Sequence, residues 1–189
     1  MVGMDTKAAL LDSAEQAIRA RGYDGFSFAD LAAEVGIRKA SIHHHFPTKA
    51  DLALALIARY SDNFFLKLGQ ISETHSTGGA RLKAYVSACR DALDGGRKLC
   101  LCVAFCTGRD GLSPAVLARL DGFHRTVATW LEDVFTAGKA DNSIAEISDS
   151  YAEAQACLAQ MEGAQLIARA AGDVGRFDAA VARLLDRIE

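Results

Sequence analysis

The sequence predicts an all-α protein with two domains. Half of its 189 residues are apolar and only two are proline. The apolar residues recur every three or four positions, which is the spacing of an amphipathic helix rather than the alternation of a β-strand. Glycines and short polar runs divide the chain into helical segments. We expect a three-helix domain over residues 1–50 and a larger helical domain over residues 51–189.

The first two helices of the smaller domain follow from their end signals. The first is expected over residues 5–21, with Asp5 as its N-terminal cap. The second begins after Ser27, because Asp30 follows three residues later and the two side chains can form a capping box. Gly36 ends this helix, as a glycine commonly does just after the last helical turn.

A third, short helix over residues 39–46 completes the layout of a helix-turn-helix. Two short helices joined by a tight turn are a common arrangement for reading DNA. Residues 35–50 contain no acidic side chain, while Arg38, Lys39 and Lys49 supply positive charge, which contact with phosphate groups requires. The alternative is a solvated helical hairpin inside an ordinary bundle.

The total charge does not by itself indicate a nucleic-acid partner, because the chain carries a net charge of −3. Residues 1–50 hold six basic and six acidic side chains, so the acidic excess lies in the remainder of the chain. A locally basic surface on an acidic protein suits a regulator that must let go of DNA.

Thr48 is expected to cap a long helix that runs to about Glu73, with Asp51 as its capping partner. Apolar residues lie nearly all round this helix, so several of its faces must be buried. We interpret it as a connector whose start packs on the smaller domain and whose remainder enters the larger one. A continuous helix of this kind can transmit a tilt between domains.

Five more helices are expected, over residues 80–94, 97–107, 114–137, 148–171 and 176–188. Gly138 is expected to end the third of these. The last two are amphipathic, and small residues are frequent in the first of that pair. They can pair with the same helices of a second copy in a four-helix interface, or they can close the core of the monomer, and the sequence leaves both open.

The sequence contains no signature of an enzyme or of a nucleotide-binding loop. His43, His44 and His45 stand together, but on a helix they point about 100° apart and cannot converge on one ion. We therefore expect no metal and no cofactor.

Three of the five cysteines fall in the helix expected over residues 97–107, namely Cys100, Cys102 and Cys106. The last two share a helix face but lie too far apart for a disulfide. Arg97 and Lys98 would lie one turn before a cysteine, where their charge would favour a reactive thiolate and hence a sensor. The alternative is that the cysteines are small apolar side chains of a buried helix.

A pocket for a small-molecule effector is the other candidate site within residues 80–137. Its lining would consist of Tyr85, Phe105, Phe123, His124 and Trp130. An apolar cavity with one or two polar groups is the usual small-molecule site. The simpler interpretation is that these side chains belong to the core.

The first 55 residues resemble the DNA-binding domain of the TetR family of transcriptional repressors. Members of that family resemble the pattern FxxxxLAxxxGVxxGTLYxHFxxKxxL. The residues of this chain in step with it are Phe26, Leu31, Ala32, Gly36, Ile37, Ala40, Ser41, Ile42, His44, Phe46, Lys49 and Leu52. Arg38, Ala40 and His43 replace the family's usual small cap, glycine and tyrosine. The resemblance implies a homodimer that binds a palindromic operator in double-stranded DNA and is released by a small-molecule effector.

The resemblance also implies which residues contact DNA. Base edges would be faced by Lys39, Ala40, Ser41 and His44, and phosphates by His43, Thr48 and Lys49. Ser27 and Arg38 are the remaining expected contacts. The departures from the family pattern affect which operator sequence the protein would bind, and they do not affect the resemblance to the family.

The stretch from Lys98 to Val116, KLCLCVAFCTGRDGLSPAV, resembles a branch of that family that senses electrophiles and oxidants and has the segment GCLxVxxxxxxxxLS at this place. Within that resemblance Cys100 matches the sensor cysteine. Ala104 stands where some members of the branch carry a lysine.

No apolar run approaches the ~20 residues of a membrane span, and the N-terminal residues do not resemble a signal peptide. We therefore expect a cytoplasmic DNA-binding regulator that is not an enzyme and has no membrane partner. Two alternatives remain, a cysteine-based enzyme and a helical module that does not bind DNA.

Overall fold

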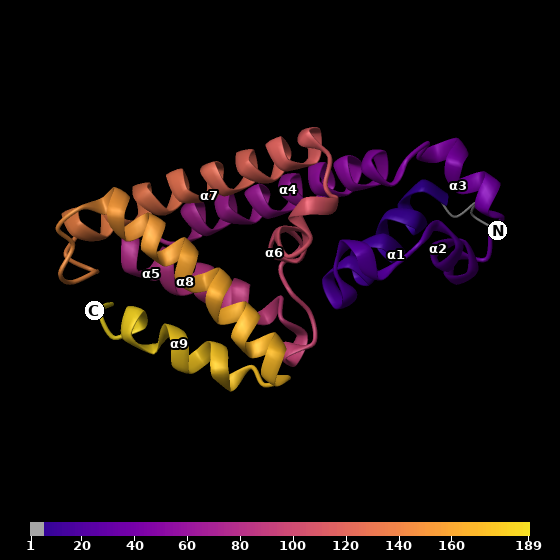
Figure 1. Ribbon diagram of the computed structural model, residues 1–189. Coiled ribbons are helices and arrows are strands. Elements are labelled where there is room, and N and C mark those ends of the chain that lie inside the picture. The colour runs from indigo at the N-terminus through magenta and orange to yellow at the C-terminus, as the bar shows by residue number, and fades with distance from the viewer. Residues whose placement is uncertain (1–5) are drawn as a thin grey trace. The chain divides into compact units, whose positions relative to one another are not determined.

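The computed structural model describes residues 6–189, and helices account for nearly all of its regular structure (Figure 1). In chain order the elements are α1 (Thr6–Arg21), η1 (Tyr23–Gly25), α2 (Phe28–Val35), α3 (Lys39–His45), α4 (Lys49–Thr74), α5 (Gly78–Asp91), η2 (Asp94–Gly96), α6 (Leu101–Cys106), η3 (Arg109–Gly111), α7 (Pro114–Ala140), α8 (Ser150–Ala171) and α9 (Gly175–Leu185). Within this range the only strand-like pairing is an isolated antiparallel bridge between Ile144 and Ile188. The all-α prediction is confirmed.

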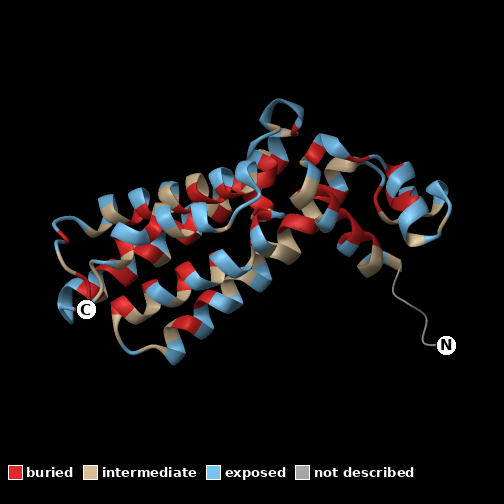
Figure 2. Ribbon diagram, turned by 90° about the horizontal axis from the view of Figure 1, so that it is seen from below, coloured by how far each residue is buried: buried red, intermediate tan, exposed pale blue. Residues whose placement is uncertain are grey.

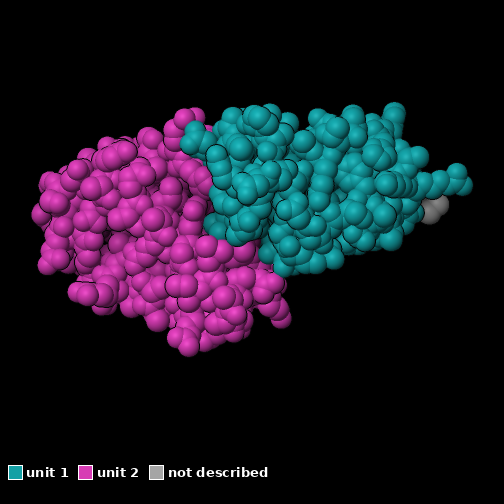
Figure 3. All heavy atoms as spheres, viewed as in Figure 1, with its two compact units in different colours: residues 1–62, 101–121 teal, residues 63–100, 122–189 magenta. Residues whose placement is uncertain are grey.

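The described chain divides into two compact units (Figure 3). The first comprises residues 6–62 and 101–121, and the second comprises residues 63–100 and 122–189. The boundary predicted after residue 50 falls inside the first unit. This unit also takes the first half of α4 and the whole of α6, because three short helices alone bury too little apolar surface for a stable core.

The core of the first unit combines the helix-turn-helix with these additions. Fully buried apolar side chains come from five helices and include Leu10, Ile18, Leu31, Ile42, Leu52, Leu56 and Phe105. The ring of Phe105, on α6, packs 5.4 Å from that of Tyr23. The cap predicted at Asp5 lies outside the described residues.

The helix predicted over residues 97–107 is shorter than expected, since α6 begins only at Leu101. Asp94, Gly95 and Gly96 all have positive φ, at 50°, 67° and 90°. Three consecutive left-handed residues turn the chain out of any right-handed helix. Arg97 is therefore not one helical turn before a cysteine, and that part of the prediction was wrong.

Gly138 does not end α7, which continues to Ala140. A side chain on Gly78, at the start of α5, would place its Cβ 2.2 Å from the backbone nitrogen of Gly138. Gly78 therefore allows a close approach of α5 to α7, whereas a Cβ on Gly138 would lie 2.5 Å from the side chain of Ile144. The first amides of α5 donate to Asp141 Oδ2 (2.9 Å) and Ser143 Oγ (2.7 Å).

In the second unit α8 and α9 pack along each other. Their buried faces meet through side chains at helical spacing, and the opposite face of α8 remains exposed (Figure 2). The last helix stops at Leu185, before the predicted residue 188, because Ile188 pairs with Ile144 instead. Across residues 6–189 no helix is both long and apolar enough to cross a membrane.

Candidate nucleic-acid interface

Both ends of α2 have the local structure that the sequence predicts. Ser27 N and Oγ both donate to Asp30 Oδ2, at 2.7 and 2.8 Å, and Asp30 N donates back to Ser27 Oγ at 3.3 Å. These bonds confirm the predicted capping box and lower the pKa of the Asp30 carboxyl group. Gly36 has φ 75° and ψ 32°, the left-handed conformation predicted for the end of α2.

One face of α3 is anchored and the other is exposed. Ile42 and the following Phe46 are buried in the core of the first unit. Lys39, Ala40 and His44, three of the four residues predicted to face base edges, are exposed. The fourth is the half-buried Ser41. The sequence therefore identified the outward face of α3 correctly.

A depression of about 550 Å³ lies on this outward face. Its lining residues are Thr6, Ile37, Arg38, Ala40, Ser41, His44 and His45. None of these seven side chains is acidic, and the set unites three of the predicted base-edge contacts with Arg38. The position of Thr6, on α1, was not predicted, because it lies more than 30 residues before α3 in the chain.

His43 lies outside the lining of this depression. Its Nδ1 is 3.1 Å from the carbonyl oxygen of Pro47, and its ring meets that of Phe28 edge-on at 5.1 Å. A carbonyl oxygen can only accept a hydrogen bond, so Nδ1 must carry the hydrogen. The Nδ1 donor of His43 is thus engaged by Pro47 within the first unit.

Thr48 forms the predicted cap at the start of α4. Its Oγ1 donates to Asp51 Oδ2 at 2.7 Å, and Asp51 N donates to Oγ1 at 3.1 Å. Both residues are exposed. The hydroxyl oxygen of Thr48 is thus engaged within the helix cap.

Lys49 was predicted to contact a phosphate, but its ammonium group points into the first unit. It donates a hydrogen bond of 2.7 Å to the carbonyl oxygen of Phe26. It also lies 4.2 Å from the ring centroid of Phe26 and 4.6 Å from that of Tyr23. Burial lowers the pKa of Lys49, against the opposing effect of Asp24 and Asp30. The sequence could not predict these contacts, because they join residues that lie far apart in the chain.

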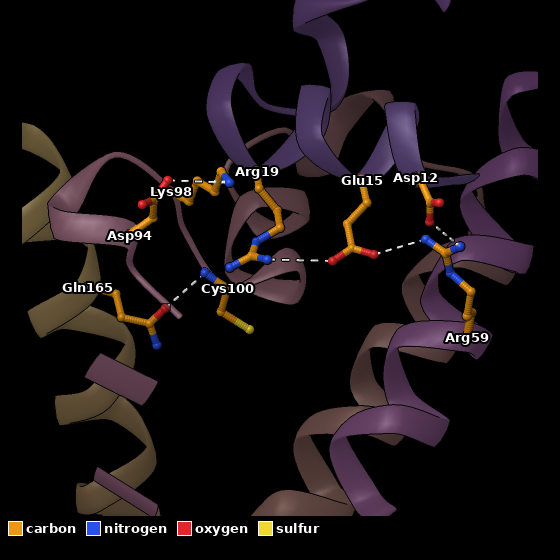
Figure 4. A network of polar contacts seen from close by, with 8 residues as sticks. All are labelled: Asp12, Glu15, Arg19, Arg59, Asp94, Lys98, Cys100 and Gln165. Atoms are coloured by element: carbon orange, nitrogen blue, oxygen red, sulfur yellow. Dashed lines mark hydrogen bonds and ion pairs between the residues drawn. The ribbon is translucent and has the colours of Figure 1, made fainter. Parts of the chain in front are cut away.

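The connector helix α4 is tied to α1 by an ionic network (Figure 4). Arg59 donates to Asp12 at 2.7 Å and to Glu15 at 3.0 Å. Arg19 pairs with the same Glu15 at 3.5 Å. These ion pairs join the first half of α4 to α1 within the first unit.

The predicted effector residues do not form one group. Phe105 belongs to the first unit, where it contacts Tyr23. The other four belong to the second unit. There the rings of Tyr85 and Trp130 are 5.6 Å apart, and His124 Nε2 lies 2.9 Å from Glu162 Oε1.

Phe123 has its own aromatic partners within the second unit. Its ring lies 5.3 Å from that of Phe64 and 5.5 Å from that of Phe65. Phe123 is buried, so it belongs to the apolar core of that unit, as the simpler interpretation of these aromatic residues holds.

The cysteines differ in their surroundings, and no disulfide joins any of them in residues 6–189. Cys102 is buried within α6, while Cys106, at its end, is exposed. Cys100 precedes α6 and is half-buried, and its amide donates to Gln165 Oε1 at 2.9 Å (Figure 4). Burial raises the pKa of Cys157 to about 12 and raises that of Cys89 further.

A metal site does not follow from the histidine run. The rings of His44 and His45 are 5.5 Å apart. Nowhere in residues 6–189 do three side chains of ligand type gather as a metal ion would require.

A family model and a solved structure both place this chain among helix-turn-helix regulators. The family model described as "Bacterial regulatory proteins, tetR family" matches residues 10–56. A transcriptional regulator of the TetR family from Agrobacterium tumefaciens has a solved structure that is 31% identical, with 97% of each chain covered and a TM-score of 0.92.

Two curated relatives match over shorter stretches. The HTH-type transcriptional regulator CymR of Pseudomonas putida is 40% identical over 52 residues, 28% of this chain and 26% of CymR. The HTH-type transcriptional activator FasR of Mycolicibacterium smegmatis is 29% identical over 90 residues, 48% of this chain and 41% of FasR. The chain thus spans less than half the length of the curated relatives it matches. The full-length likeness to the Agrobacterium regulator, together with the helix-turn-helix, shows that this chain belongs to the TetR family of DNA-binding transcriptional regulators.

Proposed function

We propose that this regulator binds a palindromic operator as a homodimer in the cytoplasm and represses transcription until an effector releases it. The exposed face of α3 supports this proposal most directly. It presents Lys39 and His44, and a depression without acidic lining is bordered by Ala40, Ser41 and His44. Lys39 and His44 can donate to base edges in a major groove, and Ala40 can contact a thymine methyl group. TetR-family regulators are in general not enzymes, and we propose no catalytic role here.

The outer face of α8 supports a homodimer. Tyr151, Leu166 and Ile167 are 58%, 40% and 55% exposed, which is unusual for side chains of this size. The exposed Ala152, Ala156 and Ala159 lie between them on the same helix. Small side chains flanked by large apolar ones allow a second copy of the helix to approach closely.

Dimerisation is tested with Ile167→Asp, which places a charge in the proposed interface. Light scattering coupled to size-exclusion chromatography should show a monomer for this variant and a dimer for the wild type. Leu66→Asp is the matched control, because Leu66 is 64% exposed on α4. A wild-type monomer at micromolar concentration would contradict the proposal.

Release of DNA requires a path from an effector to α3, and the first unit contains one. Phe105 of α6 packs on Tyr23, and Tyr23 faces the ammonium group of Lys49 at the start of α4. A shift of α6 would therefore reach the residues that directly follow α3. Two effectors fit this path, a small molecule and a thiol reagent that modifies Cys100, the residue before α6.

Footprinting on the DNA beside the gene for this protein tests the proposed function. We expect protection of an inverted repeat, weakened as salt rises because phosphate contacts release counterions. A mild alkylating agent should abolish protection by the wild type and not by Cys100→Ser if the thiol is the sensor. Absence of any protected repeat would refute operator binding. If the alkylating agent does not change the protection, the small molecule remains as the proposed effector.

A further inference from the structure

The segment that carries Cys100 is fixed against the C-terminal half of α8 by two contacts within the second unit. The first is the hydrogen bond of 2.9 Å from Cys100 N to Gln165 Oε1 (Figure 4). The second is at Gly96, where a Cβ would lie 3.2 Å from the carbonyl oxygen of Ala168 and 3.0 Å from the amide nitrogen of Asp173. The segment therefore lies directly on the last turns of α8 and on the residues that follow it.

The same segment is held in one backbone conformation by local contacts. Asp94 and the two glycines after it all have positive φ. The carboxylate of Asp94 pairs with Arg97 at 2.7 Å and with Lys98 at 3.3 Å, and the amide of Lys98 donates to the carbonyl oxygen of Leu93 at 3.0 Å. The segment therefore has little freedom to absorb a displacement at Cys100 by itself.

Gln165 holds this segment from a buried position, since only 4% of the residue is exposed. Glutamine is seldom buried unless it is hydrogen-bonded. A buried carbonyl oxygen that loses its donor has no water to replace it, which costs free energy. A shift of the Cys100 backbone is therefore expected to pull Gln165 with it rather than to break this bond.

The opposite face of the same part of α8 belongs to the proposed dimer interface. Leu166 and Ile167 directly follow Gln165 in the chain and are 40% and 55% exposed. Residues of one helix keep their relative positions, because backbone hydrogen bonds fix each turn. A pull on Gln165 therefore displaces Leu166 and Ile167 as well, and a close-packed interface tolerates only small displacements.

We propose that modification of Cys100 weakens the homodimer, and that Gln165 is the positioning residue that transmits this effect along α8. The inference rests on the proposed homodimer and on the proposed thiol effector. In alkylation the Cys100 thiol loses its proton to the buffer, its sulfur bonds to the methylene carbon of iodoacetamide, and iodide leaves. The new group is much larger than the hydrogen it replaces, so at this half-buried position it displaces the backbone.

The expected effect is a rise in the dissociation constant of the dimer. Coupling between two sites typically changes an equilibrium constant by about 5- to 150-fold, and we expect a rise of about tenfold on alkylation of Cys100. The starting protein is the full chain with Cys106→Ser, because Cys106 is exposed while Cys89, Cys102 and Cys157 are buried. Cys100 is then the thiol that the reagent reaches first.

Sedimentation equilibrium before and after iodoacetamide treatment gives the dissociation constant, and peptide mass spectrometry identifies the modified residue. Cys100→Ser in the same background should not respond to the reagent. Gln165→Met keeps the apolar stem and removes the acceptor, so its dissociation constant should change less than about threefold, below the usual range of coupling. The matched control is Gln160→Met, because Gln160 donates from α8 to the carbonyl oxygen of Ala180 instead. This control should keep the full response.

A starting protein that dimerises and does not respond to alkylation of Cys100 overturns the inference and leaves the proposed homodimer standing. A full response in Gln165→Met, or a lost response in Gln160→Met, overturns it as well, because Gln165 then does not transmit the effect. If circular dichroism shows that Gln165→Met does not fold, Gln165→Asn takes its place, since its shorter amide does not reach Cys100 N.

Two results would refute the proposed function together with this inference. A monomeric starting protein would refute the homodimer. Failure of iodoacetamide to modify Cys100 in the folded protein would refute the thiol effector.

Discussion

Lys49 Nζ and the carbonyl oxygen of Phe26 are joined by a hydrogen bond of 2.7 Å across 23 residues of sequence. Lys49 is the first residue of α4, and Phe26 directly precedes the cap of α2. The same ammonium group faces Tyr23, whose ring contacts Phe105. This lysine therefore links the entry of α2 to the exit of α3, and through Tyr23 it links both to α6.

Lys49→Met should weaken the fold as well as DNA binding. The substitution keeps the apolar stem and removes the charged hydrogen bond, so we expect the free energy of unfolding to fall by about 1–2 kcal/mol. Chemical denaturation followed by circular dichroism measures this, with Lys67→Met, an exposed lysine of the same helix, as control. Reduced DNA affinity with unchanged unfolding would instead support the phosphate contact expected from the sequence.

The capping box should make the stability contributed by Ser27 depend on pH. Hydrogen bonds from Ser27 lower the pKa of Asp30 below that of the unfolded chain, so folding favours the carboxylate. The resulting stabilisation is complete above the ordinary aspartate pKa, near 4, and is lost as the pH falls through the lowered value.

We therefore expect Ser27→Ala to be less stable than the wild type at pH 6 and the two proteins to converge toward pH 2. Thermal melts at both pH values measure the difference. A constant difference at pH 6 and pH 2 would show that Asp30 is not the group responsible.

Gly78→Ala should strongly destabilise the second unit. The new Cβ would lie 2.2 Å from the Gly138 nitrogen and 2.4 Å from its Cα. Backbone atoms cannot move away as a side chain can, so we expect a loss of at least about 2–3 kcal/mol. Gly69→Ala on α4 is the control, because no atom lies within 4 Å of its Cβ position. Helix propensity predicts a gain of up to about 1 kcal/mol there. Equal stability of the two variants would disprove the close helix contact.

Alkylation of the native protein should separate the cysteines by burial. At pH 7.5 we expect iodoacetamide to modify Cys106 first and Cys100 more slowly, because they are exposed and half-buried. Burial raises the pKa of Cys157 to about 12, so its thiol stays protonated and out of reach. Peptide mass spectrometry over time measures the order. Labelling of Cys157 as fast as Cys106 before unfolding would contradict the burial.

The starts of α2 and α4 and the end of α2 could be predicted from local signals, whereas the end predicted for α7 at Gly138 was wrong. Ser27 with Asp30, Gly36, and Thr48 with Asp51 form the predicted caps. A capping box depends on residues three positions apart, so spacing alone identifies it. The outward face of α3 could also be predicted from local sequence, because helical periodicity places Ile42 on the opposite face from the exposed residues.

The site residues that could not be predicted depend on contacts between distant parts of the chain. Lys49 reaches Phe26 rather than solvent, and Thr6 lines the depression on α3. Phe105 packs in the first unit although it follows a segment of the second. Neither propensity nor spacing contains information about such neighbours.

By itself the sequence determined an all-α chain, the helix-turn-helix and the residues that α3 presents outward, because these depend on periodicity and caps within one or two turns. The tertiary structure decided where the helix before Leu101 breaks, why Gly78 and Gly138 are glycines, and which side chains surround Lys49. These outcomes depend on the packing of segments brought together only by folding, where steric contact and burial override local preference.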